Sequence, residues 1–175
     1  MILLVISFVL TIAVSFLCSI MESVLLSTTF PYIEQLKQNG VGGAYRLHRH
    51  KEHSDRSLAA ILSLNTIANT IGASVVGVQA TAVFGEAYYG VVSALLTIFI
   101  LVCSEIIPKS IGTKYWRSLA LNVARILTVL TIIMYPFTVL SELITRHIAK
   151  KDKEENYSRE EISALANLGA KEGVF

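Results

Sequence analysis

The sequence predicts an all-α membrane protein, and three observations lead to this prediction. The chain of 175 residues is 53% hydrophobic and only 16% charged, and its mean hydropathy of +0.59 lies above the usual range of soluble domains. Its apolar residues form runs long enough to cross a bilayer as helices, which takes about 20 residues. Its basic residues gather between these runs, although the net charge is only +2. The expected partner is therefore the lipid bilayer and not nucleic acid.

The first expected span, 2–26, is apolar except for serine, threonine and Glu22. We do not expect a signal peptide here, because no basic region precedes the apolar run and no small-residue cleavage site follows it. The next segment, 28–57, is polar and basic, and its glycine-rich stretch at 40–43 predicts a break between two short helices. Its positive charge places this segment in the cytoplasm, so the N-terminus is expected outside.

The second expected span, 58–84, is rich in small and polar residues, which is typical of a helix packed against protein rather than lipid. A tight turn at 85–87 follows, and because it lacks basic residues we expect it outside. The third span, 88–107, returns to the cytoplasmic side, where Lys109 and Trp116 would lie at the interface. These features predict three transmembrane helices per subunit.

A fourth apolar stretch, 119–144, has basic residues beyond both ends, so both ends are expected in the cytoplasm. It contains Arg125 and also Pro136, which cannot donate an intrahelical hydrogen bond and tends to kink a helix. We therefore expect a Pro-kinked juxtamembrane helix that dips into the inner leaflet, with a fourth crossing as the alternative. A charged linker at 150–155 follows, and the capping-box spacing that begins at Ser158 predicts a soluble helix.

Polar side chains inside the expected spans carry the chemical information, because each costs free energy in hydrocarbon unless it is paired, wetted or bound to an ion. The main candidates are Ser19, Glu22 and Ser23 in the first span, Ser63, Asn65, Thr66 and Asn69 in the second, and Glu105 in the third. Since the spans alternate in direction, these residues can converge at one depth. Oxygen ligands without an intramembrane thiolate or histidine suit a hard cation such as Mg²⁺, Ca²⁺ or Na⁺. Hydrogen bonding between helices is the alternative for the neutral residues.

The stretch SEIIPKS at 104–110 closes the third span. A carboxylate in this position, Glu105, is a functional candidate by default, although Lys109 one turn later offers a salt bridge as a structural explanation. Pro108 would free the carbonyl of Ser104, four residues before it, to bind water or an ion.

These residues resemble those of a known family. Residues 104–109 resemble the glutamate-x-x-proline-lysine signature of the transmembrane domain of the CorC/cyclin M (CNNM) magnesium transporters. Residues 19–23 resemble the Ser-Gly-Ser-Glu-Thr element of that family's first helix, and residues 64–69 resemble the Gly-Asn-x-x-x-Asn element of its second. Ile20 and Leu64 stand where the family usually has glycine.

The resemblance implies a homodimer with a cytoplasmic belt of short helices and a dehydrated Mg²⁺ in an inward-facing cavity, with export of the ion coupled to Na⁺. It implies metal ligation by Ser19, Thr66, Asn69 and Glu105. Further candidate ligands for the metal or a coupling ion are Glu22, Ser23, Asn65 and Ser63, and Pro108 and Lys109 form the structural motif. Residues 1–148 would be the transmembrane domain, and 149–175 would begin an acidic cytoplasmic segment leading to a CBS-pair module beyond this chain.

Three functions stay open: an ion transporter, a membrane-anchored Mg²⁺ sensor or regulator, and a structural anchor for a cytoplasmic domain. An enzyme is not expected, because no nucleophile–base pair or phosphate-cradling loop is apparent, and the histidines His48, His50 and His53 are interpreted as a solvated face. Small residues in the second span favour a homodimer. They are Gly72, Ala73, Ser74 and Gly77. The expected location is the plasma membrane, with several crossings, the N-terminus outside and the C-terminus in the cytoplasm.

Overall fold

The computed structural model describes residues 2–85 and 89–148, and every regular element in this part of the chain is a helix. The all-helical prediction is confirmed there. The elements are α1 Ile2–Ser27, α2 Phe30–Gln38, α3 Ala44–Glu52, α4 Ser54–Phe84, α5 Tyr89–Ile100, the π-helical turn η2 Leu101–Ile106, α6 Ile107–Lys114, α7 Trp116–Ile133 and α8 Tyr135–Ile148. Contacts divide the chain into one unit of residues 1–141 and a second from residue 142 onward, and only the first is considered below. The predicted domain boundary after residue 148, and the helix expected from Ser158, fall at or beyond the edge of the described residues.

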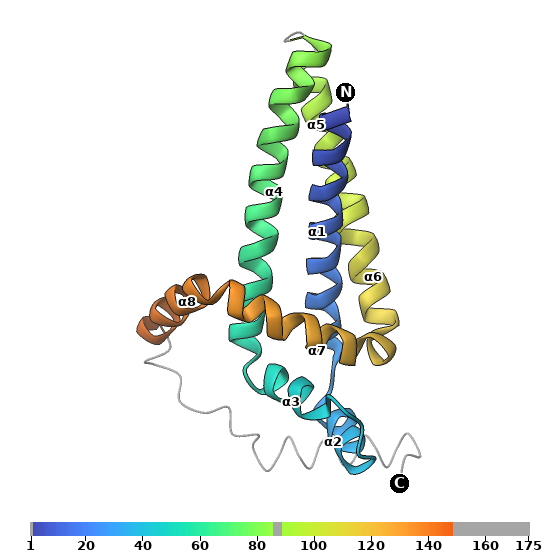
Figure 1. Cartoon of the computed structure of the whole chain (residues 1–175), viewed down its shortest axis with the longest axis vertical. Helices are drawn as coiled ribbons and strands as arrows, with labels where there is room; N and C mark the ends of the chain where they lie inside the picture. Colours follow the sequence, from blue (N-terminus) through green and yellow to red (C-terminus); the bar gives the residue numbers. More distant parts are fainter. Residues whose placement is uncertain (1, 86–88, 149–175) are drawn as a thin grey trace. The chain divides into compact units, whose positions relative to one another are not determined.

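Four stretches of the described residues are long and apolar enough to cross a membrane: α1, α4, the α5–α6 segment from Ser93 to Lys114, and α7. Within residues 1–141, α1, α4 and the α5–α6 segment run alongside one another, whereas α7 crosses the ends of α1 and α4 (Figure 1). This orientation agrees with a helix that lies along the membrane surface. The predicted number of three crossings remains a prediction.

The polar segment after α1 forms two short helices, as the sequence predicts. Between α2 and α3 the chain turns with positive φ at Gly40 (66°) and Gly43 (100°), a conformation that glycine adopts without steric cost. Lys51 of α3 reaches back to the end of α1, where its Nζ donates to the carbonyls of Leu25 (3.1 Å) and Leu26 (3.2 Å). A lysine that binds the last carbonyls of a helix also stabilises the negative end of the helix dipole.

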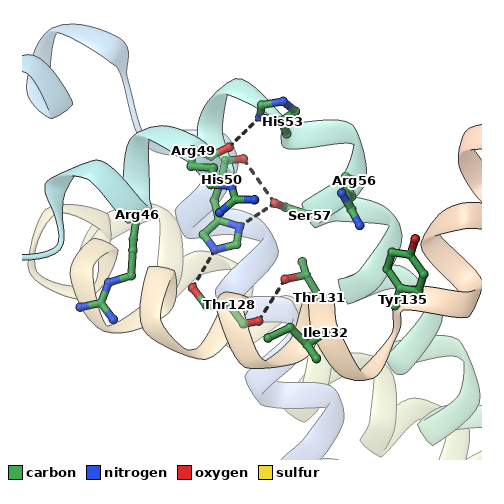
Figure 2. A pocket seen from close by; sticks show the side chains of 10 residues that line it. All are labelled: Arg46, Arg49, His50, His53, Arg56, Ser57, Thr128, Thr131, Ile132 and Tyr135. Carbon is green, nitrogen blue, oxygen red and sulfur yellow. Dashed lines mark hydrogen bonds between the residues drawn. The ribbon is translucent and has the colours of Figure 1, made fainter.

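His50 joins three helices, which corrects the expectation that all three histidines of this segment are solvated. Its side chain is buried on α3, where Nδ1 lies 3.0 Å from Ser57 Oγ of α4 and Nε2 lies 3.0 Å from Thr128 Oγ1 of α7 (Figure 2). The Thr128 hydroxyl donates to the Ala124 carbonyl, and the Ser57 hydroxyl also lies 3.3 Å from the His50 carbonyl, to which it donates. Burial first, and then the positive charges of Arg49 and His53, lower the pKa of His50 below its usual value of 6.5.

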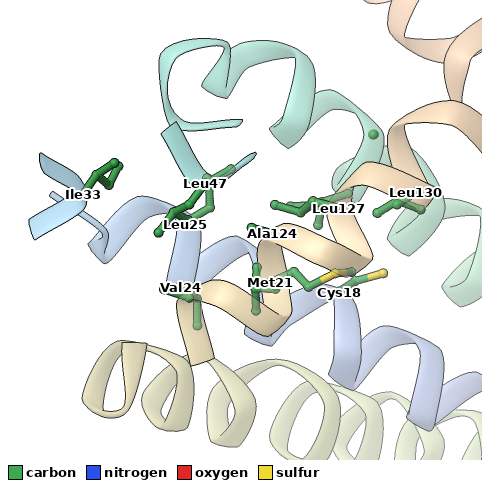
Figure 3. Packing of buried hydrophobic residues seen from close by; sticks show 13 residues of the cluster. Cys18, Met21, Val24, Leu25, Ile33, Leu47, Ala124, Leu127 and Leu130 are labelled. Carbon is green, nitrogen blue, oxygen red and sulfur yellow. The ribbon is translucent and has the colours of Figure 1, made fainter. Parts of the chain in front are cut away.

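An apolar cluster holds these helices together where α1, α3 and α7 meet. Met21 and Leu25 of α1, Leu47 of α3 and Leu127 of α7 are almost fully buried in it (Figure 3). Burial of each such side chain stabilises the fold by about 1.5–3 kcal/mol relative to exposure. The cluster thereby fixes α7 and the short helices at the ends of the long ones.

Two prolines lie at helix junctions, and the outcome differs from the expectation at both. The helical segment does not end near Ile107 but continues through Pro108 to Lys114, because Pro108 falls in the first turn of α6, where no intrahelical donor is needed. The predicted kink near Pro136 is a break, since α7 ends at Ile133 and a new helix begins at Tyr135.

Candidate functional site

Polar side chains link α1 and α4 in the middle of their lengths. Ser15 Oγ donates to Asn65 Oδ1 at 2.7 Å, and Asn69 Nδ2 donates to the same oxygen at 3.5 Å. The two lone pairs of this oxygen are thus occupied by two donors. Asn65 therefore serves as the interhelical hydrogen-bonding residue that the sequence offers as an alternative to a ligand.

Two further oxygens on these helices, Ser19 Oγ of α1 and Asn69 Oδ1 of α4, are buried and have no hydrogen-bond partner among the described residues. Ser19 lies one turn after Ser15 on α1 and is fully buried. Other hydroxyls of α1, such as those of Thr11 and Ser23, donate to the carbonyl four residues before them, but that of Ser19 does not. Buried polar atoms without a partner are rare, and each calls for an explanation such as a bound water or ion.

The hydrogen bond to Asn65 determines which polar atom of the Asn69 amide has no partner among the described residues. Asn65 presents its carbonyl oxygen to Asn69, so the Asn69 amide group must face it with its nitrogen, and Oδ1 points elsewhere. An amide oxygen held in this way is a ready ligand for a cation.

The second-span candidates Thr66 and Ser63 are outside this network. Thr66 is exposed on α4 and Ser63 is half-buried, and neither side chain makes a hydrogen bond within the part of the chain that the structure describes. Their predicted role as ligands stays a prediction. Ser23, another candidate, donates its hydroxyl to the carbonyls of Ser19 (2.9 Å) and Ile20 (3.1 Å).

Glu105 lies in η2, and its side chain is half-buried. Lys109 does not pair with it in the described structure, because the lysine Nζ lies 3.3 Å from Glu22 Oε2 of α1. The salt bridge considered as a structural explanation for Glu105 is therefore absent from this structure. Glu22, a candidate ligand, is the residue that pairs with the lysine instead.

The backbone around Glu105 is irregular. The Ile107 N–H binds the Val102 carbonyl, five residues back, and Pro108 has no N–H to offer. The carbonyls of Cys103 and Ser104 therefore lack their regular helical donors, one because Ile107 is engaged elsewhere and the other because of the proline. Single π-helical turns of this kind occur frequently at functional sites.

Comparison with known proteins identifies the family. Residues 5–175 match the family described as the cyclin M transmembrane N-terminal domain. The chain belongs to this family. It is 35% identical over 159 residues to the UPF0053 protein sll1254 of Synechocystis sp., a match that covers 91% of this chain and 46% of that protein.

Two further relatives are bacterial. A UPF0053 protein of Haemophilus influenzae is 29% identical over 73% of this chain and 30% of its own length. The UPF0053 inner membrane protein YfjD of Escherichia coli is 25% identical over 67% of this chain and 28% of its own length. The chain thus spans less than half the length of each of these relatives. Like its family, it is a multi-pass membrane protein.

In this cyclin M domain, α1 is the common neighbour of the candidate ligands. It packs against α4, which bears Asn69, and against η2, which bears Glu105. No group of three histidines, cysteines or carboxylates gathers among the described residues, so a metal site here would combine one carboxylate with hydroxyl and amide oxygens. Such a set suits a hard cation rather than zinc or copper. Ser15, which organises the two asparagines, is one of the polar residues of the first span but was not among the predicted ligands, although it lies four residues before Ser19 and therefore on the same helical face.

Proposed function

We propose that the chain is the membrane domain of a divalent-cation transporter and that its cargo is Mg²⁺. The observation that carries the proposal is two buried oxygens without a hydrogen-bond partner among the described residues, Ser19 Oγ on α1 and Asn69 Oδ1 on α4, together with the packing of α1 against the turn that bears Glu105. A dehydrated divalent ion cannot be held in a low-dielectric site by neutral oxygens without a large uncompensated charge, so it needs at least one carboxylate. Glu105 supplies it.

The proposed ligands approach the number that the ion requires. Mg²⁺ takes about six oxygen ligands in octahedral geometry. Ser19, Asn69, Thr66 and Glu105 would supply four side-chain oxygens, and the carbonyl of Cys103 or a water molecule could complete the set. Thr66 would join when its exposed face of α4 is covered.

We further propose that transport is export coupled to Na⁺, through a cavity that opens to the cytoplasm. Membership of the cyclin M family supports this direction. The basic residues of α3 support the orientation of the domain, because positive charge marks the cytoplasmic ends of membrane helices.

A homodimer is proposed as the working assembly, on a surface that differs in part from the predicted one. Gly72 faces α1 within the subunit, where a Cβ would overlap the Thr11 side chain, so it is not available to a second copy. Ser74 and Gly77 instead line a shallow groove of small residues on α4. A second copy of α4 could approach closely there. Disulfide crosslinking of Ser74→Cys in vesicles, with Leu62→Cys on α4 as the control, should give a dimer for the first variant alone.

The deciding experiment is Mg²⁺ flux from proteoliposomes that contain the full-length protein, with a Na⁺ gradient imposed or withdrawn. We expect flux that depends on the gradient and is lost in Glu105→Gln. Mg²⁺ binding without flux would favour the sensor or regulator. A protein that shows no Mg²⁺ binding and no Mg²⁺ flux would favour the structural anchor.

A further inference from the structure

A cavity of about 590 Å³ lies apart from the proposed cation site, where α3, the start of α4 and α7 meet. Its walls carry three arginines, Arg46 and Arg49 from α3 and Arg56 from α4, together with His53. Figure 2 shows these side chains with Tyr135, which comes from the start of α8. No carboxylate lines the cavity among the described residues. Such a concentration of positive charge in a concave surface attracts anions.

Hydrogen bonds and an aromatic contact hold the walls of the cavity in place. His50 forms part of its wall and is fixed by bonds to both α4 and α7, so the helices that carry the arginines are held in register. The guanidinium of Arg56 lies 5.4 Å from the centre of the Tyr135 ring, within the range of a cation–π contact. The first turn of α4 also borders the cavity, and its N-cap residue His53 makes no side-chain capping bond. The positive end of this helix dipole lies beside the arginines, and Asp55 in the same first turn offsets part of its field.

The residues beside the cavity indicate which kind of anion it would bind. Ile132 lines the cavity and is 71% exposed, and its neighbours Val129 and Ile133 on α7 are exposed as well. The basic cavity therefore opens beside an apolar face that lies at the ends of the membrane helices. A free anion would contact only the basic cavity. A phospholipid would contact both surfaces, with its phosphate at the arginines and its acyl chains along the apolar face of α7.

We propose that this cavity binds a phosphate group and that the group is carried by an anionic phospholipid of the adjacent leaflet. Guanidinium groups suit phosphate because they donate two parallel hydrogen bonds in a planar fork. A bound lipid would tie α3 to α7 and so set the position of the short helices against the membrane. The same arginines could accept a free phosphate, and the test below separates the two sources.

The test compares two double variants of the full chain that remove equal charge. Arg46→Gln with Arg49→Gln removes two exposed arginines of the cavity, and Lys114→Gln with Arg125→Gln removes two exposed basic residues elsewhere. Phosphatidylglycerol retention is measured by native mass spectrometry and by titration into detergent-solubilised protein, with phosphatidylcholine as the neutral lipid. We expect the cavity pair to weaken phosphatidylglycerol binding roughly 30-fold, since each basic residue near a membrane surface contributes about a factor of five. The control pair lines no part of the cavity, so it removes only the general attraction of the surface and should weaken binding several-fold less than the cavity pair.

The other outcomes are equally clear. An equal loss in both pairs, or no loss in the cavity pair, would overturn the proposal, because binding would then follow overall charge or take place elsewhere. If inorganic phosphate raises the melting temperature of the parent but not of the cavity pair, while phosphatidylglycerol binding is unchanged, the lipid assignment is overturned and the cavity belongs to a soluble phosphate. None of these residues is a proposed cation ligand, so the result does not depend on the transport proposal.

Discussion

Lys109 of α6 pairs with Glu22 of α1 across a helix interface, with Nζ and Oε2 3.3 Å apart. The lysine that follows Pro108 is thus held by the first membrane helix and leaves the carboxylate of its own helix, Glu105, without an ion pair among the described residues. The two acidic residues of these helices therefore have different roles. Glu22 joins α6 to α1, whereas Glu105 has no ion pair among the described residues and is the carboxylate that we propose as the cation ligand.

The Glu105→Gln variant should fold and dimerise as the parent does but lose Mg²⁺ binding and flux. The amide keeps the size of the side chain and removes the negative charge, and no ion pair in the described structure depends on that charge. Isothermal titration calorimetry measures the binding, and the proteoliposome assay measures the flux. Normal Mg²⁺ affinity in this variant would place the cation site elsewhere.

The Lys109→Gln variant should lower stability and leave Mg²⁺ affinity close to that of the parent. Its partner Glu22 is mostly buried but the lysine is half-exposed, with 47% of its side chain accessible, so we expect a loss of only about 1 kcal/mol. Melting in a mild detergent measures it. Glu22→Gln should have a similar effect, and the double variant should be no worse than either single one, because both remove the same pair. Loss of Mg²⁺ binding at unchanged stability would mean that Lys109 acts on the ion site.

A tight contact between α6 and α1 gives a prediction about packing. A Cβ on Gly112 would overlap Ser23 Oγ and lie 3.1 Å from the Ile20 carbonyl, so Gly112→Ala should destabilise the protein by about 1–3 kcal/mol. Gly90→Ala is the matched control, because nothing lies within 4 Å of its added carbon. In a helix that change should be neutral or slightly stabilising. Adding Ser23→Ala to the Gly112→Ala variant should restore part of the lost stability.

Much of the fold could be predicted from the sequence, because hydrophobic length and the placement of basic residues reflect the bilayer directly. The two short helices after α1 were also predictable, since glycine marks the break between them. The continuation of the helix through Pro108 was not. Whether a proline ends, kinks or begins a helix depends on whether the backbone carbonyls before it find other donors. Here the π-helical turn before Pro108 shifts the backbone hydrogen bonds by one residue.

The site was predictable only as a set of residue types. The sequence places Ser19, Asn69 and Glu105 at similar depth but does not say which polar groups satisfy one another. That Ser15 occupies Asn65, and that Glu22 pairs with Lys109, follows from helix rotations that are set by packing. His50 was misjudged for the same reason, because one of its two partners, Thr128, lies 78 residues further along the chain.

The buried state of His50 predicts a dependence of stability on pH. Its pKa is lowered in the folded protein, so below about pH 6.5 the unfolded chain binds a proton that the folded chain does not. This contribution to stability is fully present above that pH and is lost as the pH falls through it. The melting temperature should therefore drop between pH 7.5 and 5.5, and the drop should be smaller in His50→Gln. His48→Gln is the control, since this half-buried histidine is on the same helix and lies beside Glu52, with Nδ1 and Oε2 3.5 Å apart. An equal drop in His50→Gln and the parent would contradict the assignment.

The last prediction concerns the two ends of the segment formed by α7 and α8. Basic residues flank both ends, and α7 crosses the ends of α1 and α4 instead of running beside them, so Ser118 and Arg146 should lie on the same side of the membrane. The test places single cysteines, Lys114→Cys, Ser118→Cys and Arg146→Cys, in a background in which Cys18 and Cys103 are replaced. An impermeant thiol reagent applied to intact cells should leave all three unlabelled, and permeabilised cells should allow labelling of all three. Labelling of position 146 from outside while 114 stays protected would mean that the fourth apolar stretch crosses the bilayer and that the chain has four spans.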